Sequence, residues 1–125
     1  MITVYAALRH LNHDFNGAEY SHPTTWYIGF RAASVELSGN GYARTALTAN
    51  TTNWPTTATN VMSNGVQFTT ATASGGNWAQ ADEVALYDAS SGGNLWYWDL
   101  LDAPFTLLET RFRTFPAGAL QIRMI

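Results

Sequence analysis

The sequence predicts an all-β protein: an antiparallel, jelly-roll-like β-sandwich preceded by one short N-terminal amphipathic helix. Over the last two thirds of the chain, short runs rich in Trp, Tyr, Phe and Val alternate with Asn-Gly, Gly-Gly and Ser-Gly turns. Strands separated by such turns at a spacing of roughly 8 to 12 residues are typical of sandwiches and barrels. The 125 residues are enough for one core, so we expect a single domain over 1–125, with the helix at 3–16 and the sandwich at 24–125.

The helix is predicted from apolar residues that recur at helical spacing near the N-terminus. These residues are Val4, Ala7, Leu8, Leu11 and Phe15. Thr3 is placed to cap the first turn, and Gly17 is placed to end the helix in the left-handed conformation. The other face carries Arg9, His10, His13 and Asp14. We expect the helix to pack on its own sandwich in preference to a neighbouring subunit.

The strands are predicted from β-favouring runs that lie between turn residues. They cover residues 24–31, 35–37, 66–68, 78–87, 95–101, 105–108 and 120–124. In the last of these, Leu120, Ile122 and Met124 alternate with polar residues, as a strand with one buried face requires. Residues 45–60 are rich in Thr, Asn and Ala, and we expect an extended loop or an edge segment there.

Charge and composition exclude several classes of function. The net charge is −3, 12% of the residues are charged and lysine is missing, so we expect neither nucleic acid nor an anionic membrane as a partner. Because the chain has no cysteine, disulfides and thiolate metal sites are excluded. We also expect neither a classical signal peptide nor a membrane span, since no apolar run approaches ~18 residues.

Candidates for a metal site are weak. His10, His13 and Asp14, with His22 downstream, have a spacing that a metal site permits. No third or fourth ligand is fixed by spacing, so we interpret them as solvated side chains. We therefore predict no metal site and no cofactor.

Candidates for catalysis are equally sparse. Asp82-Glu83, and Asp99 with Asp102, have the residue types of a glycosidase, but sequence spacing does not fix the distance between two carboxylates. Adjacent acids in a strand point to opposite faces. No nucleophile elbow, P-loop or dinucleotide fingerprint occurs. We predict that the protein is not an enzyme.

The aromatic content predicts surfaces that bind other molecules. Five Trp, six Tyr and six Phe in a chain of low charge favour a symmetric homo-oligomer, because a buried interface needs fewer charges than a solvated surface. Exposed Trp and Tyr rings also stack on sugars. The candidate partner or glycan surface comprises Trp54, Trp26, Trp78 and Tyr42. Trp54 is expected to be the most exposed, because it lies in a polar segment before a proline.

Four segments carry a resemblance to a known group of proteins: 25–30 (TWYIGF), 39–44 (GNGYAR), 86–95 (LYDASSGGNL) and 115–122 (FPAGALQI). In their order and spacing they resemble the small β-sandwich proteins of tailed bacteriophages. In that group an N-terminal helix precedes a "YIALF" strand, a "GGGYARQ" turn, a "FDAATGGNLL" hairpin and an "F.AGAL.I" strand. The resemblance covers nearly the whole chain, although Asn40 replaces the middle glycine of the first turn.

The resemblance implies a structural protein on the exterior of a phage virion, made in the host cytoplasm. Such proteins are often labelled tail-fibre or minor virion proteins. We expect a homotrimer that binds phage capsid or tail proteins. Because one helix and one sandwich account for the chain without a stalk of repeats, we favour capsid decoration, in which a trimer clamps neighbouring capsid subunits. The alternatives are a tail or tail-fibre module that binds a host surface glycan, and a free-standing carbohydrate-binding domain.

Overall fold

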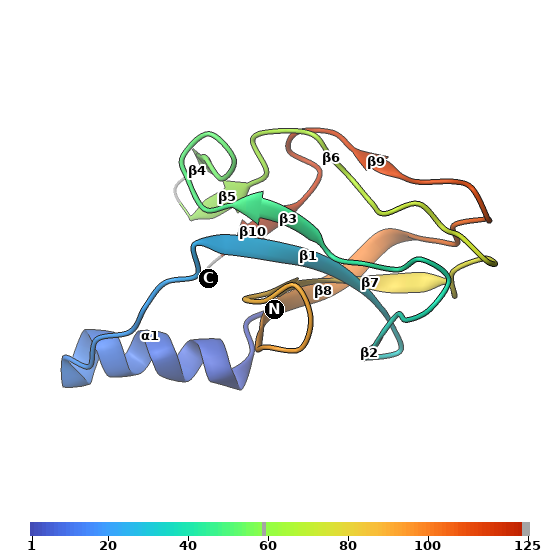
Figure 1. Cartoon of the computed structure of the whole chain (residues 1–125). Helices are drawn as coiled ribbons and strands as arrows, with labels where there is room; N and C mark the ends of the chain where they lie inside the picture. Colours follow the sequence, from blue (N-terminus) through green and yellow to red (C-terminus); the bar gives the residue numbers. More distant parts are fainter. Residues whose placement is uncertain (59, 124–125) are drawn as a thin grey trace.

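The computed structural model describes residues 1–58 and 60–123 and shows a β-sandwich with one helix beside it (Figure 1). The helix is α1 (Val4–Asn16). The strands are β1 (Thr25–Ala32), β2 (Val35–Glu36), β3 (Thr45–Thr48), β4 (Thr56–Ala58), β5 (Val61–Ser63), β6 (Phe68–Thr69), β7 (Ala81–Tyr87), β8 (Leu95–Phe105), β9 (Thr114–Phe115) and β10 (Gln121–Arg123). The predicted fold class, an antiparallel β-sandwich preceded by a short helix, is confirmed.

The larger layer is a five-stranded antiparallel sheet in the order β2-β1-β7-β8, with β3 also paired to β1. Its register places Ile28 opposite Leu86 and Phe30 opposite Val84. Because side chains alternate between the two faces of a strand, these residues share one face. Ile28, Phe30 and Leu86 are at most 2% exposed, so this face lines the core.

The opposing layer consists of two small sheets, β10-β5-β4 and β6-β9. Phe68 and Phe115 pair across β6 and β9, and their rings stack with centroids 5.0 Å apart. Phe115 also stacks on Phe30 of the larger sheet at 5.6 Å. Phe30 in turn packs nearly at a right angle against Phe105 of β8 at 5.2 Å. These phenylalanines join the two layers through ring contacts, and large apolar rings bury much area wherever they pack.

Asn64 holds the closing segment of the chain in place. Its side chain is fully buried, and its Nδ2 donates to the carbonyls of Val66 and Pro116 at 3.0 and 2.9 Å. Its Oδ1 accepts from the N–H of Leu120 at 2.8 Å, and its backbone carbonyl accepts from the N–H of Gly118 at 2.7 Å. The strands of this layer are two or three residues long and provide few ladder bonds. The amide of Asn64 therefore replaces pairing that a longer strand would supply.

On the outer face of the larger sheet, Arg44 joins a turn to a hairpin. Its Nε and Nη2 donate to the two carboxylate oxygens of Glu36 at 2.7 and 2.8 Å. Its Nη1 donates to the carbonyls of Ala89 and Gly92 in the β7–β8 connection. The guanidinium also lies 3.6 Å from the centroid of the Tyr87 ring. A planar fork of donors satisfies all of these partners at once and fixes residues 39–44 against residues 88–94.

Tyr42 completes this cluster above Gly29. Its hydroxyl donates to Glu36 at 2.7 Å and accepts from the N–H of Phe30 at 3.0 Å. A Cβ on Gly29 would lie 2.8 Å from that hydroxyl, so the strand needs glycine here. Burial raises the pKa of Glu36, but hydrogen bonds from Arg44 and Tyr42 outweigh it, and the pKa lies below its ordinary value. Burial and the hydrogen bond to Glu36 raise the pKa of Tyr42 well above its ordinary value.

The predicted helix and most predicted strands are confirmed with small shifts. Thr3 caps α1 by accepting from the N–H of Ala6 at 3.2 Å, and Gly17 ends the helix with φ 68°. Residues 45–60 contain the short strands β3 and β4. The strand predicted at 105–108 is wrong, because Phe105 is the last residue of β8 and the chain then leaves the sheet. Met124, predicted in the last strand, lies outside the described residues.

Asn64→Ala is expected to lower the free energy of unfolding by about 3 kcal/mol, because it removes a buried amide and three hydrogen bonds to the backbone of Val66, Pro116 and Leu120. Chemical denaturation followed by Trp fluorescence measures this change. Gln67→Ala, at an exposed position three residues away, is the matched control and should change stability by no more than about 0.5 kcal/mol. A loss below roughly 1 kcal/mol for Asn64→Ala would contradict the role given to Asn64.

The Glu36 cluster predicts a loss of stability in acid. Because the folded state lowers the pKa of Glu36, its carboxylate stabilises the fold above the ordinary value of 4.5, and this contribution disappears as the pH falls through the folded pKa. Glu36→Gln should therefore lower the free energy of unfolding at pH 7 and flatten its decline between about pH 5 and pH 3. Thermal unfolding across this range tests it, with the exposed Glu109→Gln as the matched control. An unchanged slope in Glu36→Gln would refute the assignment.

Candidate functional site

Two of the four predicted surface residues are buried. Trp54 is 7% exposed and Trp78 is 4% exposed, so the expectation that Trp54 is the most exposed of the four is wrong. The reason is a tight turn in which the N–H of Trp54 bonds to the carbonyl of Asn50 at 2.9 Å. The indole Nε1 then donates to the carbonyl of Leu47 at 3.4 Å. The turn exposes its Thr residues and directs the indole into the core.

Tyr42 and Trp26 are half-buried and lie in different surroundings. Tyr42 packs against Trp78 with ring centroids 5.2 Å apart. Trp26 packs against Trp96 at 5.5 Å and Tyr97 at 6.0 Å, close to α1. The structure thus brings Tyr42 and Trp78 together but does not gather the four predicted residues into one platform for a sugar ring.

Trp96 is the centre of an aromatic cluster that joins α1 to the sheet. The rings that surround it at centroid distances of 5.4 to 6.2 Å are Tyr5, His10, Tyr20 and Trp26. His10 bonds through Nε2 to the Tyr97 hydroxyl at 3.0 Å and through Nδ1 to the Tyr20 hydroxyl at 3.1 Å. The guanidinium of Arg9 lies over the Tyr20 ring. Of the residues expected on a polar, solvated helix face, Arg9 and His10 are therefore part of the packing, whereas His13 and Asp14 are exposed.

α1 packs on its own domain as expected, but with this polar face inward. Its remaining apolar face points away from the sandwich. Val4 is 77% exposed, Leu8 and Leu11 are 52% exposed, and Phe15 is 81% exposed; we call these four residues the α1 stripe. The orientation follows from the partner surface, whose hydroxyls and ring faces bind imidazole and guanidinium groups. An apolar face would leave those hydroxyls without partners.

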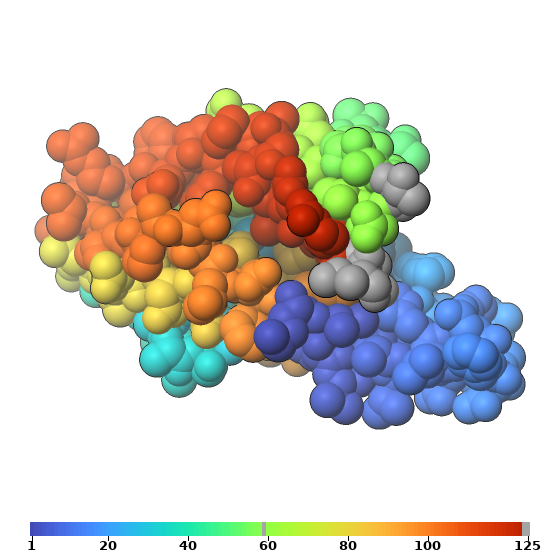
Figure 2. Space-filling view, turned by 180° about the vertical axis from the view of Figure 1, so that it is seen from behind, coloured from blue at the N-terminus to red at the C-terminus, as the bar shows by residue number. Residues whose placement is uncertain are grey.

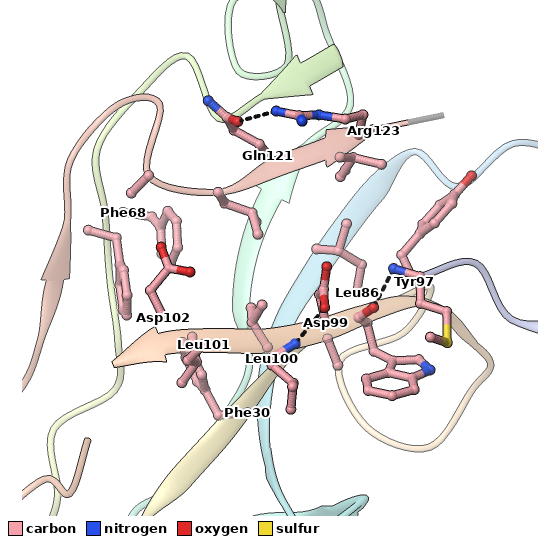
Figure 3. Close-up of a pocket in the computed structure, with 18 of the residues that line it drawn as sticks. Phe30, Phe68, Leu86, Tyr97, Asp99, Leu100, Leu101, Asp102, Gln121 and Arg123 are labelled. Atoms are coloured by element: carbon pink, nitrogen blue, oxygen red, sulfur yellow. Dashed lines mark hydrogen bonds between the residues drawn. The ribbon is translucent and has the colours of Figure 1, made fainter. Parts of the chain in front are cut away.

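A cleft of about 970 Å³ opens between β8 and the C-terminal segment 118–123. Figure 2 shows the face of the molecule on which the two segments meet the start of the chain, and Figure 3 shows the lining. Phe30, Leu86 and Leu101 supply apolar lining, and Asp99 and Asp102 project from β8 toward the closing segment (Figure 3). Apolar walls with a few polar groups are typical of ligand sites of this size.

Two of the remaining candidate acids have local partners. Glu83 forms a buried ion pair with Arg31 at 2.8 Å, and Asp82 accepts from the N–H of Ala33 at 3.2 Å. Within residues 1–58 and 60–123, no three His, Asp or Glu side chains gather into a potential metal site. In the same part of the chain, no helix combines the length and the apolar character that crossing a bilayer requires.

The outward face of α1 and the cleft were not predicted from the sequence. The periodicity of the α1 stripe is visible in the sequence. It does not determine which face of α1 packs on the sandwich. The cleft has no local signal, because residues 99–102 and 118–123 belong to different sheets and come together only where the two layers face each other. Asp99 and Asp102 are evident in the sequence as acids, but the apolar residues that surround them in the cleft are not.

Comparison with known proteins connects this architecture to a phage family. No curated protein matches the chain. A family model described as podophage GP4 fiber I protein gp80 matches residues 1–123 of the 125. The match covers α1, both layers of the sandwich and the cleft, and it confirms the resemblance to small virion proteins of tailed phages. The chain therefore belongs to the podophage GP4 fiber I protein gp80 family, a family of small structural proteins of the phage virion.

Proposed function

We propose that this chain is a non-enzymatic subunit of a fibre on the exterior of a podophage particle, made in the host cytoplasm and assembled as a homotrimer bound to tail proteins. The family supports a fibre component of the virion. The single observation that supports the oligomer is the α1 stripe, because a contiguous apolar patch on a soluble protein marks a contact with another protein. The contribution of such a subunit is buried contact area and not chemistry.

A position on the tail is favoured over the capsid decoration that the sequence suggested. The family description names a fibre, and a shell-decorating role has no comparable support. A fibre built from several kinds of chain can use a small subunit at its base or its tip. A subunit made of one helix and one sandwich is therefore compatible with a tail position.

Imaging tests this assignment. Purified protein is added to particles that lack it, and the mixture is examined by cryo-electron microscopy after unbound protein is removed. We expect ordered density with three-fold local symmetry on the tail. Density at the symmetry axes of the shell would overturn the tail position in favour of decoration, and density at neither place would overturn the role as a virion subunit.

As a second function, we propose that the cleft between β8 and the segment 118–123 binds a host surface glycan. Its volume of about 970 Å³ is sufficient for a short oligosaccharide. The carboxylates of Asp99 and Asp102 can accept hydrogen bonds from sugar hydroxyls, and the half-buried ring of Tyr97 lines the same space. This cleft, and not Trp54 or Trp78, is the surface of the described residues that we assign to a sugar.

A glycan array of bacterial surface polysaccharides tests the cleft. The wild-type protein should retain at least one glycan, and Asp99→Ala with Asp102→Ala should weaken its binding by roughly tenfold or more, because each charged acceptor contributes a strong hydrogen bond. Glu109→Ala removes an exposed acid outside the cleft and should bind like the wild type. The proposal fails if no glycan is retained, or if the double variant binds as tightly as the wild type.

A further inference from the structure

We propose that the α1 stripe is a coiled-coil seam through which copies of this chain associate, with α1 of one copy packed against α1 of its neighbours. The inference rests on the homo-oligomer of the proposed function and names the surface that forms it. The occupant of the stripe is thus a second and a third copy of this chain.

The spacing of the stripe is that of a heptad repeat. Val4, Leu8, Leu11 and Phe15 follow one another at intervals of four, three and four residues, and all four are more than half exposed. Apolar residues at alternating intervals of three and four define the a and d positions of a coiled coil, with Leu8 and Phe15 at a and Val4 and Leu11 at d. Over two heptads a straight helix drifts by only about 20° per heptad, so the stripe stays on one line.

The orientation of the helix prevents the stripe from being buried by its own domain. Ala6, on the side of α1 opposite the stripe, is 0% exposed against the sheet. His10 bonds to the hydroxyls of Tyr97 and Tyr20, and these bonds fix the rotation of the helix about its axis. Turning the stripe inward would break both bonds. The seam therefore stays available to another molecule, and Figure 1 shows α1 lying outside the two layers of the sandwich.

The flanking residues favour identical helices over other partners. The e and g positions beside the seam are Tyr5, Ala7, Asn12 and Asp14. Asp14 is the one charged residue among these four, so like-charge repulsion between identical helices is confined to the last turn of α1. The same residues oppose a membrane surface, which needs basic residues beside the apolar face. The nearest cation, Arg9, is turned inward over the rings of Tyr5 and Tyr20.

The area of the seam sets the strength of the association. Four side chains with these exposed fractions form an apolar patch on the order of 400 Å², below the ~800 Å² per partner of a stable complex. In a trimer each stripe contacts two neighbours, so the whole patch is used. We therefore expect an oligomer whose mass depends on concentration in the micromolar range, and further contacts in the virion would strengthen it.

Substitution of the seam tests the inference by sedimentation velocity and by light scattering after gel filtration. The wild type should form trimers at roughly 100 μM, and Leu8→Glu should be monomeric at the same concentration, because it would bury one charge from each copy in the Leu8 layer of the bundle. Leu108→Glu is the matched control, since Leu108 is 56% exposed outside α1 and should leave the mass unchanged. Near-ultraviolet circular dichroism verifies the fold of each variant, and Leu8→Gln replaces Leu8→Glu if the charge prevents folding.

The alignment of the helices is tested by crosslinking. A three-fold axis along the seam makes the helices parallel, so Leu11 of one copy meets Leu11 of the next. Because the chain has no cysteine, Leu11→Cys introduces a single thiol, and mild oxidation should yield covalent dimers at high efficiency. A cysteine at the matched exposed position, Leu108→Cys, should yield few. Equal yields from both variants would overturn the parallel seam.

The outcomes separate the seam from the proposed function. If the wild type is trimeric and Leu8→Glu remains trimeric, the seam is overturned while the homo-oligomer stands. If the wild type is monomeric at every concentration, both the seam and the proposed homotrimer fail. If Leu8→Glu is monomeric and Leu108→Glu is trimeric, the seam is supported whatever the position of the protein on the virion.

Discussion

The buried amide of Asn64 is the constraint on which the smaller layer of the sandwich depends. That layer has strands of two or three residues, which are too short to hold their own register by ladder bonds. Asn64 compensates by bonding to the backbone of both the segment after it and the closing segment at 116–120. With the closing segment fixed, Phe115 stays over Phe30 and the two layers remain in contact. The cleft beside β8 has a defined shape for the same reason.

Short stretches of sequence predicted the elements that neighbouring residues determine, namely the ends of the helix, the first strand and the turns. The limits of α1 followed from Thr3 and Gly17, because a cap needs particular residue types at the end of a helix. β1 followed from a run of β-favouring residues, and the turns followed from their glycines. The strand predicted at 105–108 failed because the same apolar residues serve a strand and a buried loop equally well. Leu107 is 6% exposed without belonging to a strand.

The candidate site could be predicted only in part, because its causes are tertiary. The polar segment around Trp54 suggested that its side chain is exposed. Instead, the turn between Asn50 and Trp54 directs the indole into the core. The apolar periodicity of α1 suggested an inward face, yet the sheet offers the helix the hydroxyl of Tyr97 and the ring of Trp96, which contact His10. Two of the segments that carry the resemblance to phage proteins, 39–44 and 86–95, have a structural role. Arg44 joins them across the outer face of the sheet. The cleft arises where distant segments meet.

Thr3 gives the junction between helix and sandwich a mechanical property. Its hydroxyl accepts from the N–H of Ala6 and donates to the carbonyl of Leu95 at 2.7 Å, while its own N–H donates to the carbonyl of Trp96 at 2.9 Å. Thr3 therefore both caps the helix and bonds to the backbone of β8. No flexible residue lies between these two attachments to act as a hinge. The helix cannot swing without losing its own cap. In an assembly joined through α1, each sandwich would be held at a fixed angle to its helix. A force that bends the assembly would therefore act directly on the sheet.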